Sequence, residues 1–126
     1  MAYAKSLSIF DDISAEVNRE ARAIGIDLLN GLVMLTPVDT GRAKGNWFVG
    51  IDRPNRSIDS FRKARQAITD GVATINDVVN GKYRTIVISN NLPYIEQLNN
   101  GTSDQAPKKF VETEINRVVN ARNKNG

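Results

Sequence analysis

The first third of the chain carries a regular apolar stripe. Apolar residues recur at steps of three and four: Phe10, Ile13, Val17, Ala21, Ile24, Leu28, Leu32 and Leu35. This spacing is typical of an amphipathic helix that buries one face. Ser8 or Asp11 suits the start of such a helix as a cap, and Pro37 predicts its end near Leu35, because the residue before a proline avoids helical geometry. The pattern therefore predicts one long N-terminal helix.

Two later segments read as strands. Trp47–Ile51 is rich in aromatic and β-branched residues, and Tyr83–Ser89 contains a run of consecutive apolar residues. Before the first of these, Asp39 and Thr40 are good capping residues, so we expect a short helical turn over residues 41–45. Because a lone tryptophan beside the start of a strand usually packs, we expect Trp47 to lie in the core rather than to stack on a ligand.

The segment between the two strands is the least regular part of the chain. Ser57 or Asp59 could cap a helix from Ser60 to Ile68, and Gly71 is expected to interrupt it. The apolar residues of segment 72–79 fit a second, shorter helical piece, although their β-branched side chains weaken that prediction. Residues 80–81, Asn-Gly, then predict a tight turn before the second strand.

The last third predicts two helices. Residues 90–93 form a break, Tyr94–Leu98 a short helix, and residues 99–101 a left-handed cap at Gly101. Pro107 suits the first turn of a final helix. That helix has its own apolar stripe: Phe110, Val111, Ile115, Val118 and Val119. The polar residues 120–126 are expected to fray.

The order of these elements predicts one α+β domain over residues 1–126. In it, the long N-terminal helix and the C-terminal helix pack on a small, mostly antiparallel sheet. A short sheet leaves edges that need covering, and such edges are natural places for subunits to pair.

Composition removes most enzyme classes. The chain has neither cysteine nor histidine, which excludes disulfides, thiol nucleophiles, histidine acid–base catalysis and the commonest zinc ligands. The acidic candidates look like solvated faces: Asp11, Asp12, Asp77, Glu96, Glu112 and Glu114. Gly41 and Gly45 follow a helix and lack the Gly-Lys-Ser/Thr ending of a phosphate loop. We therefore expect no enzyme activity, metal, cofactor or small-molecule substrate; an enzyme with an oxygen-only metal site is the alternative.

The net charge of +3 is unevenly distributed. Five basic residues cluster within segment 52–65: Arg53, Arg56, Arg62, Lys63 and Arg65. Such runs are usually solvated surface, and aromatic residues do not alternate with these cations as they do in nucleic-acid stacking platforms. A mild positive surface is the preferred interpretation, and a DNA-facing surface the alternative. No apolar run is long enough for a signal peptide or a membrane span, so we expect a soluble protein without membrane partners.

Two blocks of sequence carry a family resemblance. The first is Val38-Asp39-Thr40-Gly41-Arg42, with Trp47 shortly after it. The second is Asn90-Asn91-Leu92-Pro93-Tyr94-Ile95, followed by Gln105-Ala106-Pro107. In this order they resemble the tail-completion, or neck, proteins of long-tailed bacteriophages and prophages. The chain departs from the family pattern over residues 99–104, where an acidic residue, an aromatic and Gly-Ser are frequent, and at Lys108, where glycine is common.

The resemblance implies a structural virion protein that joins the finished tail to the DNA-filled head. It implies a subunit that forms a ring with itself, as a hexamer or dodecamer, and contacts a head-completion or connector protein and a tail terminator. Such a protein is located in the virion neck, after assembly in the host cytoplasm. A DNA-contacting module in the neck channel and a transient assembly factor are the alternatives.

The resemblance also provides candidate interface residues: Asp39, Thr40, Arg42, Trp47, Tyr94, Gln105 and Pro107. Each competes with a purely structural role. Capping is favoured for Asp39 and Thr40, and a packed position for Tyr94. For Arg42, a local salt bridge with Asp39 and a contact with a partner are equally good interpretations.

Overall fold

The fold is α+β, as the sequence predicts. The computed structural model describes residues 3–9, 15–38, 41–78, 84–101 and 109–125. In chain order the elements are β1 (Tyr3–Ile9), α1 (Ala15–Leu35), the short 3-10 helix η1 (Lys44–Asn46), β2 (Trp47–Ile51), α2 (Ala64–Asn76), β3 (Arg84–Asn90), α3 (Ile95–Asn99) and α4 (Phe110–Asn125). Among the described residues, no helix has the length and apolarity needed to cross a membrane.

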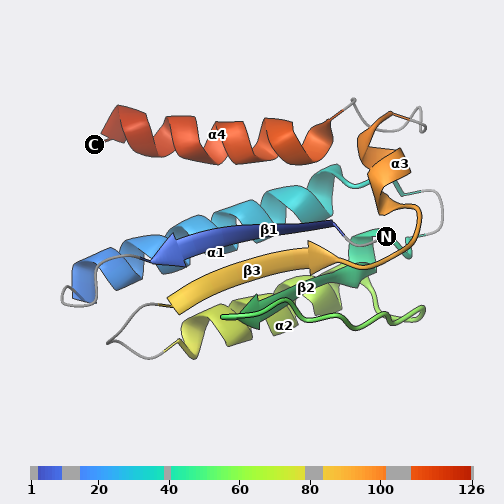
Figure 1. Ribbon diagram of the computed structural model, residues 1–126, viewed down its shortest axis with the longest axis horizontal. Helices are drawn as coiled ribbons and strands as arrows, with labels where there is room; N and C mark the ends of the chain where they lie inside the picture. The colour runs from blue at the N-terminus through green and yellow to red at the C-terminus, as the bar shows by residue number, and fades with distance from the viewer. Residues whose placement is uncertain (1–2, 10–14, 39–40, 79–83, 102–108, 126) are drawn as a thin grey trace.

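The sheet has three antiparallel strands in the order β1-β3-β2 (Figure 1). Trp47 of β2 lies opposite Asn90 of β3, and Tyr3 of β1 lies opposite the same Asn90 on the other side. Strand β1 was not among the predicted elements. Ser8 lies in this strand, so its predicted role as the cap of the first helix is wrong. Within the strand, residues 6–9 (Ser-Leu-Ser-Ile) alternate small polar and apolar side chains, and this period of two is the signal that predicts a strand.

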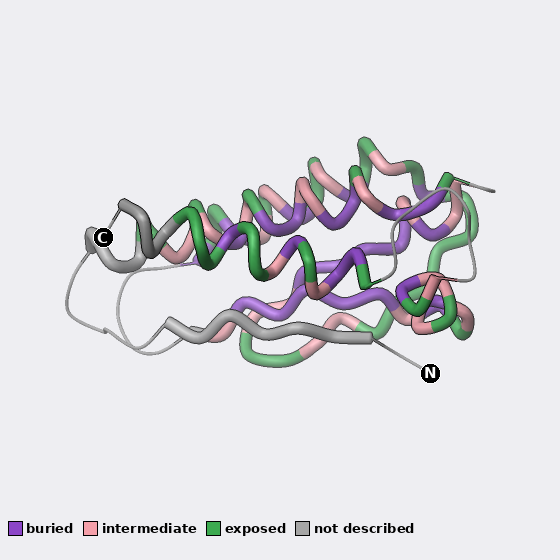
Figure 2. Tube along the Cα trace, turned by 90° about the horizontal axis from the view of Figure 1, so that it is seen from above, coloured by how far each residue is buried: buried purple, intermediate pink, exposed green. Residues whose placement is uncertain are grey.

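The core lies between the helices and one face of the sheet. Helices α1 and α2 pack on each other, α2 also packs on β2, and α4 lies alongside α1 (Figure 1). Figure 2 shows the buried parts of the helices turned inward and their exposed parts turned away. The largest fully buried side chains come from every layer: Leu28, Leu29, Leu32, Trp47, Ile75, Ile86, Ile88, Leu92, Ile95 and Phe110. Helix α1 therefore contacts both the sheet layer and α4.

Helix α2 corrects two predictions for the middle of the chain. It begins at Ala64 rather than Ser60, and it continues through Gly71 instead of breaking there. A Cβ atom at position 71 would lie 2.4 Å from Leu29 Cδ2 and 2.9 Å from Val49 Cγ2. The glycine thus lets α2 approach both α1 and the sheet. The packing gained outweighs the propensity cost of about 1 kcal/mol for glycine inside a helix.

The boundary between α3 and α4 follows the predicted turn chemistry. Gly101 has φ +94°, which confirms the left-handed cap after the short helix. The preceding Asn99 is buried, and its Oδ1 accepts a hydrogen bond of 2.9 Å from the backbone N–H of Val111. Asn99 therefore satisfies a donor in the first turn of α4. Helix α4 extends to Asn125, so the segment from residue 120 that the sequence predicts to fray is the last part of this helix.

A buried carboxylate joins α4 to α1. Glu114 is only 4% exposed, which corrects the prediction of a solvated face. A Cβ atom at Gly31 would lie 2.1 Å from Glu114 Oε1, so the glycine makes room for this carboxylate. Arg117 forms an ion pair with Glu114 and another with Asp27 of α1, the latter at 2.8 Å. Hydrogen bonds to Glu114 and then to Asp27 raise the pKa of Arg117 above its ordinary value.

Candidate functional site

The two sequence blocks of the resemblance meet in space. Asn90 is fully buried, and its Nδ2 donates a hydrogen bond of 2.9 Å to the carbonyl of Ala43. Trp47 lies opposite Asn90 in the sheet, and its Nε1 donates a hydrogen bond of 2.8 Å to Thr36 Oγ1. The end of α1, the turn before β2 and the end of β3 therefore form one buried unit, although residues 43 and 90 are far apart in the sequence.

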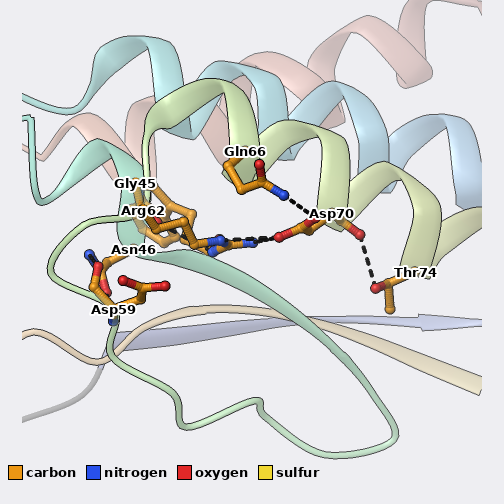
Figure 3. Close-up of polar contacts among 8 residues, drawn as sticks. Gly45, Asn46, Asp59, Arg62, Gln66, Asp70 and Thr74 are labelled. Carbon is orange, nitrogen blue, oxygen red and sulfur yellow. Dashed lines mark hydrogen bonds and ion pairs between the residues drawn. The ribbon is translucent and has the colours of Figure 1, made fainter.

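Arg62 is the central side chain of a polar cluster at the edge of β2 (Figure 3). It is 8% exposed, and its Nη1 donates to the carbonyls of Trp47 at 2.8 Å and Gly45 at 3.3 Å. Its Nη2 lies 3.1 Å from Asp70 Oδ2 of helix α2, and the guanidinium is 4.0 Å from the centre of the Phe48 ring. Arg62 is therefore not a DNA-facing residue, and that prediction is wrong, because β2 and α2 occupy its charged group.

Asn46 holds the loop that leads from β2 to α2. The side chain is fully buried, and its Nδ2 donates to the carbonyls of Arg42 and Asp59, both at 2.8 Å. Its Oδ1 accepts a hydrogen bond of 2.8 Å from the Asp59 N–H. The Asp59 Oδ1 in turn accepts from the Phe61 N–H at 2.9 Å, so Asp59 stabilises a turn rather than capping a helix.

The same loop is also held from strand β3. Ser89 is fully buried, and its Oγ donates a hydrogen bond of 3.0 Å to the Asn55 carbonyl. Asn91 Nδ2 donates to Asn55 O at 2.8 Å and to Ser57 O at 3.1 Å. The loop therefore has backbone groups bound at three points, residues 55, 57 and 59, by side chains from the sheet layer. Loops held in this way present their exposed side chains in a defined place.

An exposed aromatic residue stands at the end of this loop. The Phe61 side chain is 90% exposed, and Ile58 nearby in the sequence is 49% exposed. Phe61 borders an open hollow of about 580 Å³. The hollow includes the buried pair Phe48 and Arg62, and exposed groups of both charges: Asp59, Lys63, Arg65 and Asp70. We call Phe61 together with this hollow the Phe61 patch.

The other predicted interface residues divide into three groups. Trp47 is fully buried, which confirms the packed interpretation and makes its role as an interface candidate wrong. Tyr94 is half-buried and packs against the core, as its preferred interpretation predicts, and Arg42 is also half-buried. Asp39, Thr40, Gln105 and Pro107 lie outside the described residues.

Four of the five basic residues proposed to face DNA are exposed: Arg53, Arg56, Lys63 and Arg65. Sequence reasoning missed Phe61, Asn46 and Asp70 as members of the site. Asp70 lies in α2, eight residues after Arg62, and Arg62 lies in the loop before that helix. The helical spacing of three or four residues therefore does not predict that the two side chains meet. The Asx-type pattern at Asp59, which forms the turn before Phe61, is the one local signal in this segment.

The site has the character of a binding surface. Among the residues that the structure describes, no group of three or more carboxylates could hold a metal ion. Comparisons of the chain with protein-family models, with curated proteins and with solved structures found no match. The features of the site that bear on function are a loop held by buried side chains, an exposed aromatic ring and mixed charges beside it.

Proposed function

We propose that this chain is a structural, non-enzymatic subunit of the neck of a long-tailed bacteriophage or prophage, where it completes the tail and joins it to the DNA-filled head. The observation that carries the proposal is the pairing of Trp47 with Asn90 in the sheet, beside the buried hydrogen bond from Asn90 to the Ala43 carbonyl. It joins the two sequence blocks that resemble the tail-completion family. A chance match of two short blocks gives no reason for them to pack on each other.

In this role the protein acts by forming interfaces. The partners are further copies in a ring, a head-completion or connector protein and a tail terminator. Two features support interface formation. Strands β1 and β2 are the two edges of a sheet of three strands, and edge strands are sites at which chains pair. The loop before α2 holds an exposed aromatic ring on a braced backbone, which is the character of an interface anchor.

DNA contact within the neck channel is the second candidate. The exposed side chains of Arg53, Arg56, Lys63 and Arg65 on one segment favour it. Binding of this kind depends strongly on salt, because cations on the protein displace counterions from phosphates. Absence of DNA binding by the purified protein at low salt would remove this candidate and leave the structural role unaffected.

A joining assay tests the proposed function. A phage that lacks this chain is expected to accumulate DNA-filled heads and finished tails as separate particles. Addition of the purified protein to such a lysate is expected to restore joined, infectious particles, as measured by plaque counts and negative-stain microscopy. Joined particles at the normal yield in the absence of the chain would contradict the proposal.

A further inference from the structure

The position of Phe61 is fixed by the fold. On one side its own N–H is bound by Asp59, and Asp59 is held by the buried Asn46. On the other side the next residue, Arg62, is buried and bound to Trp47 and Asp70. The chain between these anchors has little freedom to turn the ring inward. A phenyl ring that is 90% exposed on a braced loop is the arrangement of a preorganised binding anchor.

The hollow beside Phe61 has room for a second phenyl ring. Its volume is about 580 Å³, and an apolar cavity of about 150 Å³ is enough to hold benzene. Phe48 and the guanidinium of Arg62, which lies 4.0 Å from the Phe48 ring centre, are mostly buried and form part of the wall of the hollow. Both favour contact with an aromatic ring. The Phe61 patch thus contains an exposed phenyl ring and a hollow large enough to hold the same ring of a second copy.

The charges of the patch are complementary to themselves. Lys63 and Arg65 supply two exposed cations, Asp59 supplies an exposed carboxylate, and Asp70 adds a half-exposed carboxylate that also pairs with Arg62 of its own chain. A surface of one sign repels a second copy of itself. A mixed surface rotated by a two-fold axis can place the cations of one copy against the carboxylates of the other. The same carboxylates would oppose the phosphates of DNA, so the patch fits a second copy better than it fits nucleic acid.

From these three observations we infer that the Phe61 patch is a two-fold self-association surface, in which Phe61 of each copy enters the hollow of the other. The same loop also supports the proposed role at the neck, but the two-fold contact itself requires only the residues of the patch. In a ring-forming protein, a two-fold contact of this kind joins copies in pairs or joins two rings face to face.

Sedimentation equilibrium of the purified protein tests the contact. Between roughly 1 µM and 1 mM, the range over which small interfaces dissociate, the wild type is expected to show reversible self-association. Phe61→Ser is expected to raise the dissociation constant at least tenfold, because it removes the anchor. Met34→Ser is the matched control, since Met34 is also an exposed apolar residue, 69% exposed, but belongs to α1 and does not line the hollow. Wild-type protein that stays monomeric throughout, or an equal effect of both substitutions, would overturn the inference.

Cross-linking shows which surfaces meet. The chain has no cysteine, so a single introduced cysteine can link only to the same position of another copy. Gln66→Cys, within the patch, is expected to give a disulfide-linked dimer under mild oxidation, whereas Asn120→Cys, on the exposed side of α4, is expected to stay monomeric. Equal cross-linking of the two variants would overturn the two-fold contact. The joining assay still decides the neck function in that case, so the two proposals fail independently.

Discussion

Replacement of Arg62 by methionine is expected to lower the free energy of unfolding by about 3 kcal/mol. The substitution keeps a long side chain but removes the donors for the carbonyls of Trp47 and Gly45, and it leaves Asp70 without its cation. Buried carbonyls that lose their donors bear the full cost of desolvation. Urea unfolding, followed by tryptophan fluorescence, measures the effect directly, since the chain has one tryptophan.

Arg62→Lys is the informative control for this change. Lysine keeps the positive charge, but its ammonium group lacks the planar geometry that lets Arg62 reach the Trp47 carbonyl of β2 and Asp70 at once. We therefore expect a loss between that of Arg62→Met and the wild type. A variant Arg62→Met that is as stable as the wild type would show that the cluster does not hold β2 to α2.

Gly45→Ala is expected to destabilise the fold by about 3 kcal/mol, at the upper end of the cost of overpacking a core. A Cβ atom at this position would lie 1.8 Å from the carbonyl oxygen of Arg62 and 2.6 Å from its carbonyl carbon. Both atoms belong to the backbone of the braced loop, so the clash cannot be relieved by rotation of a side chain. Thermal and urea unfolding measure the loss, and weaker self-association is expected to accompany it, because the loop that presents Phe61 must shift.

Gly41→Ala separates this clash from the general effect of removing a glycine. Gly41 has φ +72°, but a Cβ atom there has no neighbour within 4 Å. The substitution should therefore cost only the strain of a left-handed backbone, about 1 kcal/mol. Equal losses for the two alanine variants would show that the approach of Gly45 to Arg62 is not a tight one.

Much of the fold could be predicted from local pattern. The stripe over residues 10–35 predicted α1, and the strands β2 and β3 were predicted to within a residue or two. Strand β1 was missed because its short alternating segment runs directly into the apolar stripe of the helix. The break at Gly71 was predicted from propensity alone, whereas the close approach of Leu29 to that glycine is a tertiary contact that no local pattern shows.

The site was less predictable because its contacts cross irregular segments. Phe61 and Arg62 are neighbours in the sequence, yet one is 90% exposed and the other 8% exposed. The difference arises because Asn46 fixes the backbone of the loop at Asp59, while Asp70 binds the guanidinium of Arg62. Neither Asn46 nor Asp70 is separated from the loop by a spacing that is typical of a helix or a strand. Composition correctly marked segment 52–65 as basic, but it could not separate the cation that holds the fold from the four that face solvent.

We propose that this chain forms part of the neck of a phage particle. Cryo-electron microscopy of the intact virion tests it most directly, since the fold of three strands and a long α1 is recognisable in a density map. We expect a ring of copies between the head and the tail, whose density fits this chain and gives the number of subunits. A well-resolved neck in which no density fits this fold would contradict it.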